Sequence, residues 1–363
     1  MSSSIGSKFR VSIFGESHGK MIGTVIEGIP AGFEIDFDEV KSFLQKRKGG
    51  KDFTTKRNEK DKFDVVSGYF DGRATGTPFT ALIRNSDLKS KDYEYMRYVF
   101  RPSHADYTGY IKYSGFNDYR GGGHFSGRLT APLCIAGAIA MQILKKNYGV
   151  EIFSHILNIG NVCDDSICDA SYEEKKKIFE KELAFINDKK LRLAAKQIQS
   201  VQEQGDSIGG IVETEICGLR AGIGEPIFDT LEGNISKAVF AVPAVKGIDF
   251  GAGFVAGHMK GSEYNDSLRL VNDDLEKSGK IITATNHDGG VNGGISNGMP
   301  IVFCTAIKPT PSIFISQETV DISKNENTNL QIKGRHDPAI TVRAVPAVMS
   351  ATAISLLDLI MEA

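Results

Sequence analysis

The sequence predicts one α+β domain, residues 1–363, in which several β-sheets surround buried helical structure. Three observations indicate this fold class. Runs with strand periodicity occur in both halves of the chain. The most apolar long run, Leu133–Leu144, has about a dozen residues, which suits a buried helix and is too short to span a bilayer. No stretch of flexible-linker composition divides the two halves.

The first half begins with a strand at Arg10–Phe14 that leads into the loop "GESHG". A helix is expected next, because Asp36 is a typical N-cap residue and Gly49 is a typical helix stop. The segment "FDVVSGYFDGRATGTPFTALIRNSD" predicts a hairpin, with apolar runs on both sides of the Gly72–Gly76 turn. The buried helix follows and should stop at Gly149.

The second half contains two predicted helices between Ser171 and Gly205. Ser171 and Glu174 form a capping-box pattern, and Asn187–Asp188 offers a break between the helices. Lysine and glutamate are frequent here, which is typical of a solvated outer face. A strand pattern resumes at Ile208, and each half therefore runs strand, helix, strands, helix, although no sequence repeat strongly supports a duplication. Two further helices are expected, at about Asp229–Val242 and at about Ala344–Glu362.

Composition and charge narrow the class of protein. Hydrophobic residues make up 41% of the chain and charged residues 24%, as in soluble proteins with a sizeable core. The net charge of −2 argues against a nucleic-acid or membrane-surface partner, so any anion binding must be local. Among five cysteines only Cys163 and Cys168 lie close together, which predicts reduced cytosolic thiols, several of them buried, and no metal site. The start of the chain lacks the apolar core of a signal peptide, so a cytoplasmic protein is expected.

Two short loops carry histidines that are candidates for proton transfer. "FGESHGK" places His18 between glycines after a strand, although a single loop histidine is more often part of an ordinary polar turn. "RPSHAD" offers His104 and Asp106 on a short rigid segment, and Pro102 should hold Ser103 in an extended conformation.

The segment "DYRGGGHFSGR" predicts an anion pocket. Gly121–Gly123 free a row of backbone N–H groups, and Ser126 stands where the buried helix should begin. A glycine run by itself usually marks only a loop. Its position before a buried helix and between Arg120 and Arg128 favours the anion pocket.

Two segments near the C-terminus add charge. "KPTPS", Lys308–Ser312, is a stiff extended segment with one cation, and "KGRHDP" gathers Arg335, His336 and Asp337. Because Asp337 precedes Pro338, it is biased out of helical geometry. Asp337 is either an ion-pair partner of Arg335 or a functional carboxylate, and these residues alone do not decide between the two.

Taken together, these segments imply a site for a ring-shaped polyanion, with two histidines and an aspartate for proton transfer. "GAGFVAG" lacks the G-x-G-x-x-G spacing, which argues against a Rossmann fingerprint.

The segments resemble those of the chorismate synthase family. "GESHG", "RPSHADYT", "DYRGGG", "NGGIS", "KPTPS" and "GRHDP" occur in that family's order, from residue 10 to about residue 350. The resemblance implies a β-α-β sandwich that assembles as a homotetramer. The glycine-rich, weakly charged run Val291–Ile307 suggests surfaces that need covering, in agreement with a tetramer.

The resemblance also implies an activity, namely 1,4-anti elimination of phosphate from 5-enolpyruvylshikimate 3-phosphate to give chorismate, in the shikimate pathway. The family needs reduced FMN, although the reaction has no net redox change. Whether the chain reduces its own flavin with NADPH is open. Nothing in the sequence resembles an appended reductase domain, which favours a monofunctional enzyme.

Roles for individual residues follow from the same resemblance. His18 would protonate or orient the reduced flavin, His104 would stabilise the substrate and its departing phosphate, and Asp337 would assist flavin N5 as it receives the ring proton. The residues implied to bind substrate or NADP are Ser17, Arg47, Arg101, Gly127 and Arg128, with Arg335 also placed to hold substrate anions. The residues implied to contact FMN are His124, Phe125, Ser126, Pro243, Ala244, Gly293, Lys308, Pro309, Thr310, Pro311, Ser312 and Arg335.

Three positions depart from the family pattern. His124 stands where an arginine is common, because "GGGHFS" replaces "GGGRSS". Lys51-Asp52-Phe53 lack an arginine that is often found there, and Pro311 changes "KPTSS" into "KPTPS". Two other classes stay open from the residues alone. One is a phosphate-handling transferase that needs Mg²⁺ and no flavin, and the other is a non-catalytic anion- or RNA-binding protein, for which a basic pI would be expected.

Overall fold

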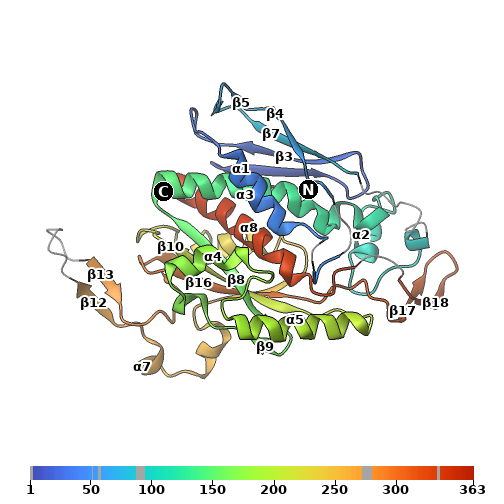
Figure 1. Ribbon diagram of the computed structural model, residues 1–363. Coiled ribbons are helices and arrows are strands. Elements are labelled where there is room, and N and C mark those ends of the chain that lie inside the picture. Colours follow the sequence, from blue (N-terminus) through green and yellow to red (C-terminus); the bar gives the residue numbers. More distant parts are fainter. Residues whose placement is uncertain (1–2, 51, 56–58, 87–94, 272–279, 333–335) are drawn as a thin grey trace.

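Two five-stranded sheets enclose a layer of long helices, so that the chain forms a sandwich of sheet, helices and sheet (Figure 1). The structure is a computed structural model that describes residues 3–50, 52–55, 59–86, 95–271, 280–332 and 336–363. The strand pairings are antiparallel throughout both sheets. The predicted α+β class and the β-α-β sandwich are confirmed.

The first sheet comes from the N-terminal part of the chain. Buried and more exposed residues alternate along its strand β7 (Phe79–Arg84), as expected for a strand with one buried face. In β7, Phe79, Ala81 and Ile83 are fully buried, whereas the residues between them are more exposed. The predicted hairpin is confirmed, since β4 pairs with β7. The strand order is β1 (Ser4–Ile5), β2 (Arg10–Gly15), β3 (Met21–Glu27), β7 (Phe79–Arg84) and β4 (Phe63–Ser67), with a small pair β5 (Tyr69–Phe70) and β6 (Arg73–Ala74) at the turn.

The second sheet comes from the C-terminal half. In β10 (Gly210–Cys217) apolar and polar residues alternate as predicted, but burial does not alternate, because Glu213 and Glu215 are buried as well as Val212, Thr214 and Ile216. The two helices predicted in this region are α4 (Tyr172–Lys177) and α5 (Asp188–Glu203). Figure 1 shows α5 on the outer face of the sheet, and Lys175 of α4 pairs with Glu215 of the sheet. The strand order is β11 (Val245–Phe250), β16 (Ile301–Ile307), β10 (Gly210–Cys217), β8 (Glu151–Ile159) and β9 (Val162–Cys163). Smaller elements are α2 (Asp106–Lys112), α7 (Gly261–Tyr264) and the strand pairs β12 (Leu268–Val271) with β13 (Lys280–Thr283), β14 (Val291–Asn292) with β15 (Ile295–Ser296), and β17 (Gln317–Asp321) with β18 (Glu326–Leu330).

The caps predicted from the sequence are present. The Asp36 side chain accepts the backbone N–H groups of Asp38 and Glu39 at the start of α1. Ser171 and Glu174 form the reciprocal capping box, and Asn187 caps α5. The remaining helices are α1 (Phe37–Arg47), α3 (Thr130–Ile143), α6 (Leu231–Val239) and α8 (Thr341–Glu362).

One argument about the buried helix is wrong. The helical segment is not limited to about a dozen residues, because Gly127–Tyr148 and Thr341–Glu362 each run for 22 residues and are apolar enough to cross a membrane. Within the most apolar window of these two segments, 78% and 83% of the residues are buried inside the protein. The burial of these helices, rather than their length, identifies them as core elements.

The cysteines differ from expectation as well. All five are free thiols, but only Cys134 is buried. Cys217 and Cys304 are partly buried, and Cys163 and Cys168 are exposed. The expectation that several thiols are buried is therefore wrong.

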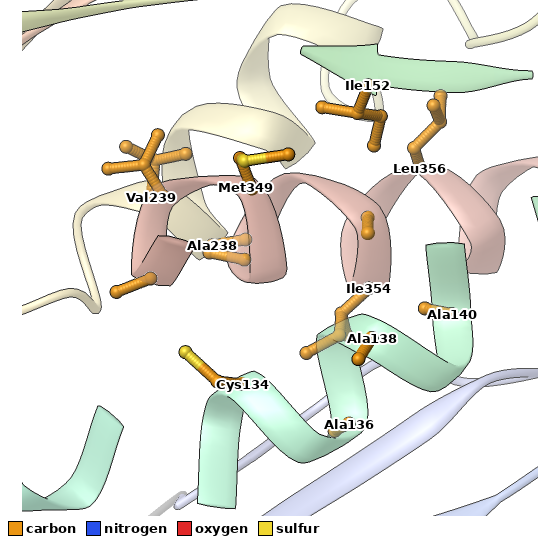
Figure 2. Packing of buried hydrophobic residues seen from close by; sticks show 14 of the residues in the cluster. Cys134, Ala136, Ala138, Ala140, Ile152, Ala238, Val239, Met349, Ile354 and Leu356 are labelled. Carbon is orange, nitrogen blue, oxygen red and sulfur yellow. The ribbon is translucent and has the colours of Figure 1, made fainter. Parts of the chain in front are cut away.

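The helix layer depends on the close crossing of α3 and α8. A Cβ atom on Gly137 would lie 2.2 Å from Ser350 Cβ and 2.4 Å from its Cα, so only glycine fits there. Small residues of α3 surround this point. Figure 2 shows Ala138 and Ala140 on the side of α3 that faces α8, whereas Ala136 lies on the side that faces away from α8. On the other side of α8, Leu356 points towards Ile152 of β8 (Figure 2). Tight helix contact on one side and sheet contact on the other make this the centre of the core.

We expect Gly137→Ala to destabilise the fold by roughly 1–3 kcal/mol, because the added methyl group must push apart two helix backbones in a packed core. Gly261→Ala is a matched control, since a Cβ there meets nothing within 4 Å. Urea unfolding followed by circular dichroism measures both variants. Equal stability of the two variants would contradict the assigned close crossing.

Candidate active site

One cavity of about 880 Å³ opens where the ends of the three central helices meet. It is lined by the end of α1, the segment before α3, the start of α8, the α6–β11 turn and the segment after β16. Its charge differs from that of the whole chain, whose net charge is −2. The described residues that line it include seven basic side chains, Arg47, Lys48, Lys112, Arg128, Lys246, Lys308 and Arg343, and three acidic ones, Glu59, Asp61 and Asp337.

Asp61 joins two of the buried arginines. Its carboxylate accepts a hydrogen bond from Arg47 Nη2 at 2.7 Å and forms an ion pair with Arg128 Nη1. Burial would raise the pKa of Asp61, but the charges of Arg47 and Arg128 outweigh it and lower that pKa. Arg47 Nε and Arg128 Nη2 are buried and have no hydrogen-bond partner among the described residues. Each arginine thus keeps a donor for a ligand.

Asp337 is held on both of its oxygens. Oδ2 accepts a hydrogen bond from Arg343 Nη1 at 2.6 Å, and Oδ1 accepts the Thr55 N–H at 2.9 Å. Arg343 Nε also donates to the Arg47 carbonyl at 3.0 Å, so the pair is fixed to the end of α1. The ion pair considered from the sequence was with Arg335, which lies outside the described residues. Among the described residues the partner is Arg343, and both side chains are largely buried.

His104 is oriented by Asp106 and Arg101. His104 Nδ1 lies 2.7 Å from Asp106 Oδ1, and Arg101 Nη2, 3.0 Å from the same nitrogen, already donates to that carboxylate oxygen. Nδ1 therefore donates to Asp106, which leaves Nε2 as the ring nitrogen for a ligand. Burial lowers the pKa of His104, while the Asp106 hydrogen bond opposes this shift. His104 is therefore neutral at neutral pH.

The triple glycine makes room for both histidines. Gly121, Gly122 and Gly123 all have positive φ angles, of 59°, 86° and 53°. A Cβ on Gly121 would lie 2.3 Å from the His18 ring, and one on Gly122 would lie 3.1 Å from His104 Cε1. The expected row of free N–H groups is only partly right, because the Gly122 N–H donates to the Tyr119 carbonyl. The loop brings His18 and His104 against its two sides.

The segment 124–126 links the loop to the helix layer. His124 Nδ1 lies 2.8 Å from the Gly15 carbonyl oxygen, and Nε2 lies 2.9 Å from the Ser3 hydroxyl. The Phe125 ring occupies the space left by the missing side chain of Gly109. Ser126 caps the helical turn before α3, as predicted, by accepting the Arg128 N–H.

The segment after β16 lies opposite. Lys308 Nζ donates to the Ser103 carbonyl, and burial, followed by repulsion from Lys246, lowers the Lys308 pKa. Thr310 Oγ1 is buried and has no hydrogen-bond partner among the described residues. The Ala244 carbonyl, next to Pro243 in the cavity wall, accepts the Lys308 backbone N–H at 2.9 Å.

Most of the residues expected from the sequence share this cavity. Those that line it are His104, Asp337, His124, Phe125, Ser126, Pro243, Ala244, Lys308, Thr310, Pro311, Ser312, Arg47, Gly127 and Arg128. Arg335 lies outside the described residues, and those that do not line the cavity are His18, Ser17, Arg101, Pro309 and Gly293. His18 and Ser17 are buried behind Gly121, and Gly293 lies in the β14–β15 turn. Arg101 forms an ion pair with Asp106.

Sequence reasoning did not assign to the site three lining residues that shape the electrostatics, namely Asp61, Arg343 and His336, although it noted His336 in the charged segment "KGRHDP". Asp61 lies between Lys60 and Lys62, and such alternation of basic and acidic residues is typical of a solvent-exposed surface. No feature of the sequence therefore indicated Asp61 as a site residue. Arg343 and His336 lie within or beside the "GRHDP" segment, and their proximity to Asp337 was the available signal.

Ser103 also departs from expectation. It is not extended, since its φ angle of 58° places it in the left-handed region. The His104 N–H donates to the Arg101 carbonyl at 3.2 Å, so residues 101–104 form a tight turn.

The fold and site define a class, an α+β protein with a deep cationic cavity suited to a small polyanion. The chorismate synthase family model matches residues 9–361. Relatives include chorismate synthases of Dehalococcoides mccartyi, 45% identical over 100% of this chain and 98% of the relative, and of Thermococcus kodakarensis, 41% identical over 97% and 96%. A chorismate synthase crystal structure, 26% identical, superposes with a TM-score of 0.75 and covers 99% of this chain and 93% of that one. The chain belongs to the chorismate synthase family, lyases of the shikimate pathway.

His336 provides a test of burial in this site. Burial, with a contribution from Arg101, lowers the pKa of His336 from 6.5 to about 4. Between these pH values the unfolded chain binds a proton that the folded chain does not bind. The contribution of neutral His336 to the free energy of unfolding is therefore fully present above pH 6.5 and is lost as the pH falls towards 4.

We expect His336→Gln to make the free energy of unfolding fall less steeply than in wild type between pH 6.5 and 4. His258→Gln, at an exposed position outside the cavity, is the matched control and should keep the wild-type slope. Urea unfolding at a series of pH values measures the slopes. Parallel curves for His336→Gln and wild type would count against the buried neutral imidazole.

Proposed function

We propose that the chain, as one catalytic domain of residues 1–363 in the cytoplasm, converts 5-enolpyruvylshikimate 3-phosphate to chorismate by 1,4-anti elimination of phosphate with reduced FMN. One observation carries the proposal beyond family membership. In a chain of net negative charge, the cavity that holds His104 and Asp337 is lined by seven basic and three acidic described side chains. A substrate with two carboxylates and a phosphate matches this excess of positive charge.

Substrate anions would be bound by donors that the fold leaves unused. Arg47 Nε and Arg128 Nη2 are desolvated without a partner among the described residues, which is costly unless a ligand accepts from them. Both guanidinium groups are held in place by Asp61, so little ordering is needed when the ligand binds.

The residues present also fit a flavin next to the substrate. A volume of about 880 Å³ is near the upper end of ordinary ligand pockets, which suits two ligands of this size bound together. Reduced FMN, when bound, would lend electron density to the substrate and recover it after phosphate has left. Its phosphate and ring would be held by the segments that the family resemblance marks, His124–Ser126, Pro243–Ala244 and Lys308–Ser312, although Pro309 does not line the cavity.

The histidines would act on charge and orientation. Phosphate leaves more readily when its growing charge meets fixed positive groups. A phosphate near His104 Nε2 would raise the lowered pKa of this imidazole and make it a charged donor to the leaving group. His18, packed behind Gly121, would orient or protonate the flavin side of the site.

Asp337 would take part in moving the ring proton lost by the substrate. Its two oxygens are fixed by Arg343 and Thr55, so the carboxylate can be presented in one orientation.

The proposal requires turnover to depend on reduced flavin. We expect chorismate formation under anaerobic conditions with chemically reduced FMN and none with oxidised FMN, followed by absorbance of the product. We also expect NADPH with oxidised FMN to give no turnover, because the enzyme is proposed to be monofunctional. Product formed with Mg²⁺ and no flavin would favour the phosphate-handling transferase instead.

The surface supports an assembly, though not for the reason expected from the sequence. Within Val291–Ile307, β16 is paired on both sides, by β10 and β11, so it presents no open edge. Large apolar side chains are exposed elsewhere, with Phe228 89% and Phe254 86% accessible. The β12–β13 pair, which extends from the body in Figure 1, exposes Leu268 and Leu270. Such surfaces usually mark contacts with a partner, and we propose a homotetramer.

We expect light scattering at micromolar concentration to give about four times the 39.5 kDa chain mass. Phe228→Asp and Phe254→Asp should lower this mass, because a charge placed in an apolar contact is poorly solvated. Asn327→Asp, which adds the same charge at an exposed position without removing an apolar side chain, is the control. A monomeric wild type would contradict the proposed assembly.

Asp337→Asn separates a catalytic from a structural role. The change keeps the shape but removes the base, for which we expect a kcat reduced about 10²–10⁴-fold with both ligands still bound. Because the pair is buried, the variant should also lose stability by roughly 3–5 kcal/mol, more than an exposed pair would cost. The kinetics are therefore measured well below the melting temperature.

Arg343→Gln is the matched control, because it breaks the same ion pair and leaves the carboxylate in place. If Asp337 acts in catalysis, Asp337→Asn should lose far more kcat than Arg343→Gln at similar melting temperatures. Similar kcat values for the two variants would leave Asp337 only its structural role.

A further inference from the structure

We infer that Ser103 is a ligand-binding residue whose hydroxyl group donates a hydrogen bond to a phosphate oxygen in the cavity, beside His104 and Lys308. The inference rests on the proposed function and adds a contact that neither the family resemblance nor the residue's expected extended conformation indicates.

The backbone at Ser103 is strained in a way that glycine would relieve. Pro102 fixes the second position of the turn 101–104, and Ser103 occupies the third with a φ angle of 58°. This arrangement is a type II turn, whose third position favours glycine because other residues rarely adopt a positive φ. Strained residues of this kind cluster at functional sites.

No contact within the described chain accounts for the serine. Ser103 is exposed and lines the cavity, and its hydroxyl makes no hydrogen bond with a described residue. Its carbonyl, in contrast, accepts from Lys308 Nζ, which anchors the turn to the opposite wall. The backbone is thus held in place at the cavity wall, and the hydroxyl is left for a ligand.

The neighbouring groups define the chemistry of the ligand. Lys308 has no ion-pair partner among the described residues, and Thr310 Oγ1 is buried without a hydrogen-bond partner among them. His104, next to Ser103, keeps Nε2 for a ligand. A cation, two hydroxyl groups and an imidazole that line the same cavity, where Lys308 reaches across to the Ser103 turn, are a donor set for a phosphate monoester.

Two phosphate monoesters could occupy this position, the leaving group of the substrate and the phosphate of FMN. Both have the same chemistry, so the structure assigns the contact to a phosphate, and binding measurements distinguish its source.

The test compares Ser103→Gly and Ser103→Ala. Glycine removes the hydroxyl and relieves the turn, whereas alanine removes the hydroxyl and keeps the strain. We expect both variants to bind either FMN or 5-enolpyruvylshikimate 3-phosphate about tenfold more weakly, because a hydrogen bond to a charged group is lost. The ligand whose dissociation constant rises is the one that supplies the phosphate bound by Ser103. The melting temperature of Ser103→Gly should be unchanged or slightly raised.

Ser114→Gly is the matched control. Ser114 has a similar φ angle of 52°, also in an exposed loop, but does not line the cavity. We expect this variant to be as stable as wild type or slightly more so, with unchanged dissociation constants.

Ser103 variants that bind both ligands within about twofold of wild type would overturn the inference while the proposed function stands. A wild-type chain that binds neither ligand would overturn both. If Ser103→Ala fails to fold, the relieved variant Ser103→Gly alone decides the outcome.

Discussion

Two buried carboxylates hold three guanidinium groups at the meeting point of the central helices, and both the fold and the cavity depend on this arrangement. Arg47 ends α1, Arg128 precedes α3 and Arg343 lies in the first turn of α8. Arg128 and Arg343 lie at helix N-termini, where a cation is unfavourable because the helix dipole already places positive charge there, whereas Arg47 lies at the C-terminal end of α1, where a cation is favourable. Asp61 and Asp337 compensate for this charge, and removing either would leave a buried cation without a partner. The cavity therefore keeps its positive lining without losing the packing of the helix ends.

The sequence predicted the elements of the fold better than their arrangement, because local signals determine elements and distant contacts determine arrangement. Asp36, Ser171 and Asn187 act as caps within one turn of the residues they contact, so their patterns could be recognised directly. The close approach of Gly137 to Ser350 joins residues more than 200 positions apart, and no local pattern indicates it. The length of the buried helix was misjudged for a related reason, because apolar composition fades before the helix ends.

The residues of the site likewise divide into those that local sequence signals indicate and those that depend on distant contacts. His104 and Asp337, which both line the cavity, could be proposed from the sequence because each lies in a short segment with unusual chemistry. Arg101, which the resemblance implies as a substrate contact, binds Asp106 and does not line the cavity, and a linear segment does not reveal this geometry. Asp61 was missed because its significance comes only from Arg47 and Arg128, which converge on it from other elements. Charge in a sequence cannot be interpreted before its partners are known.

The electrostatics of the cavity also explain how so many basic groups can share it. Burial lowers the pKa values of His104 and His336, and burial followed by Lys246 lowers that of Lys308. The two imidazoles are therefore neutral at neutral pH and add no repulsion to the arginines. A bound anion reverses the balance, because an opposite charge nearby favours the protonated form of each group. In the proposed reaction, anion binding would therefore be coupled to proton uptake, and His104 would become charged beside the bound phosphate.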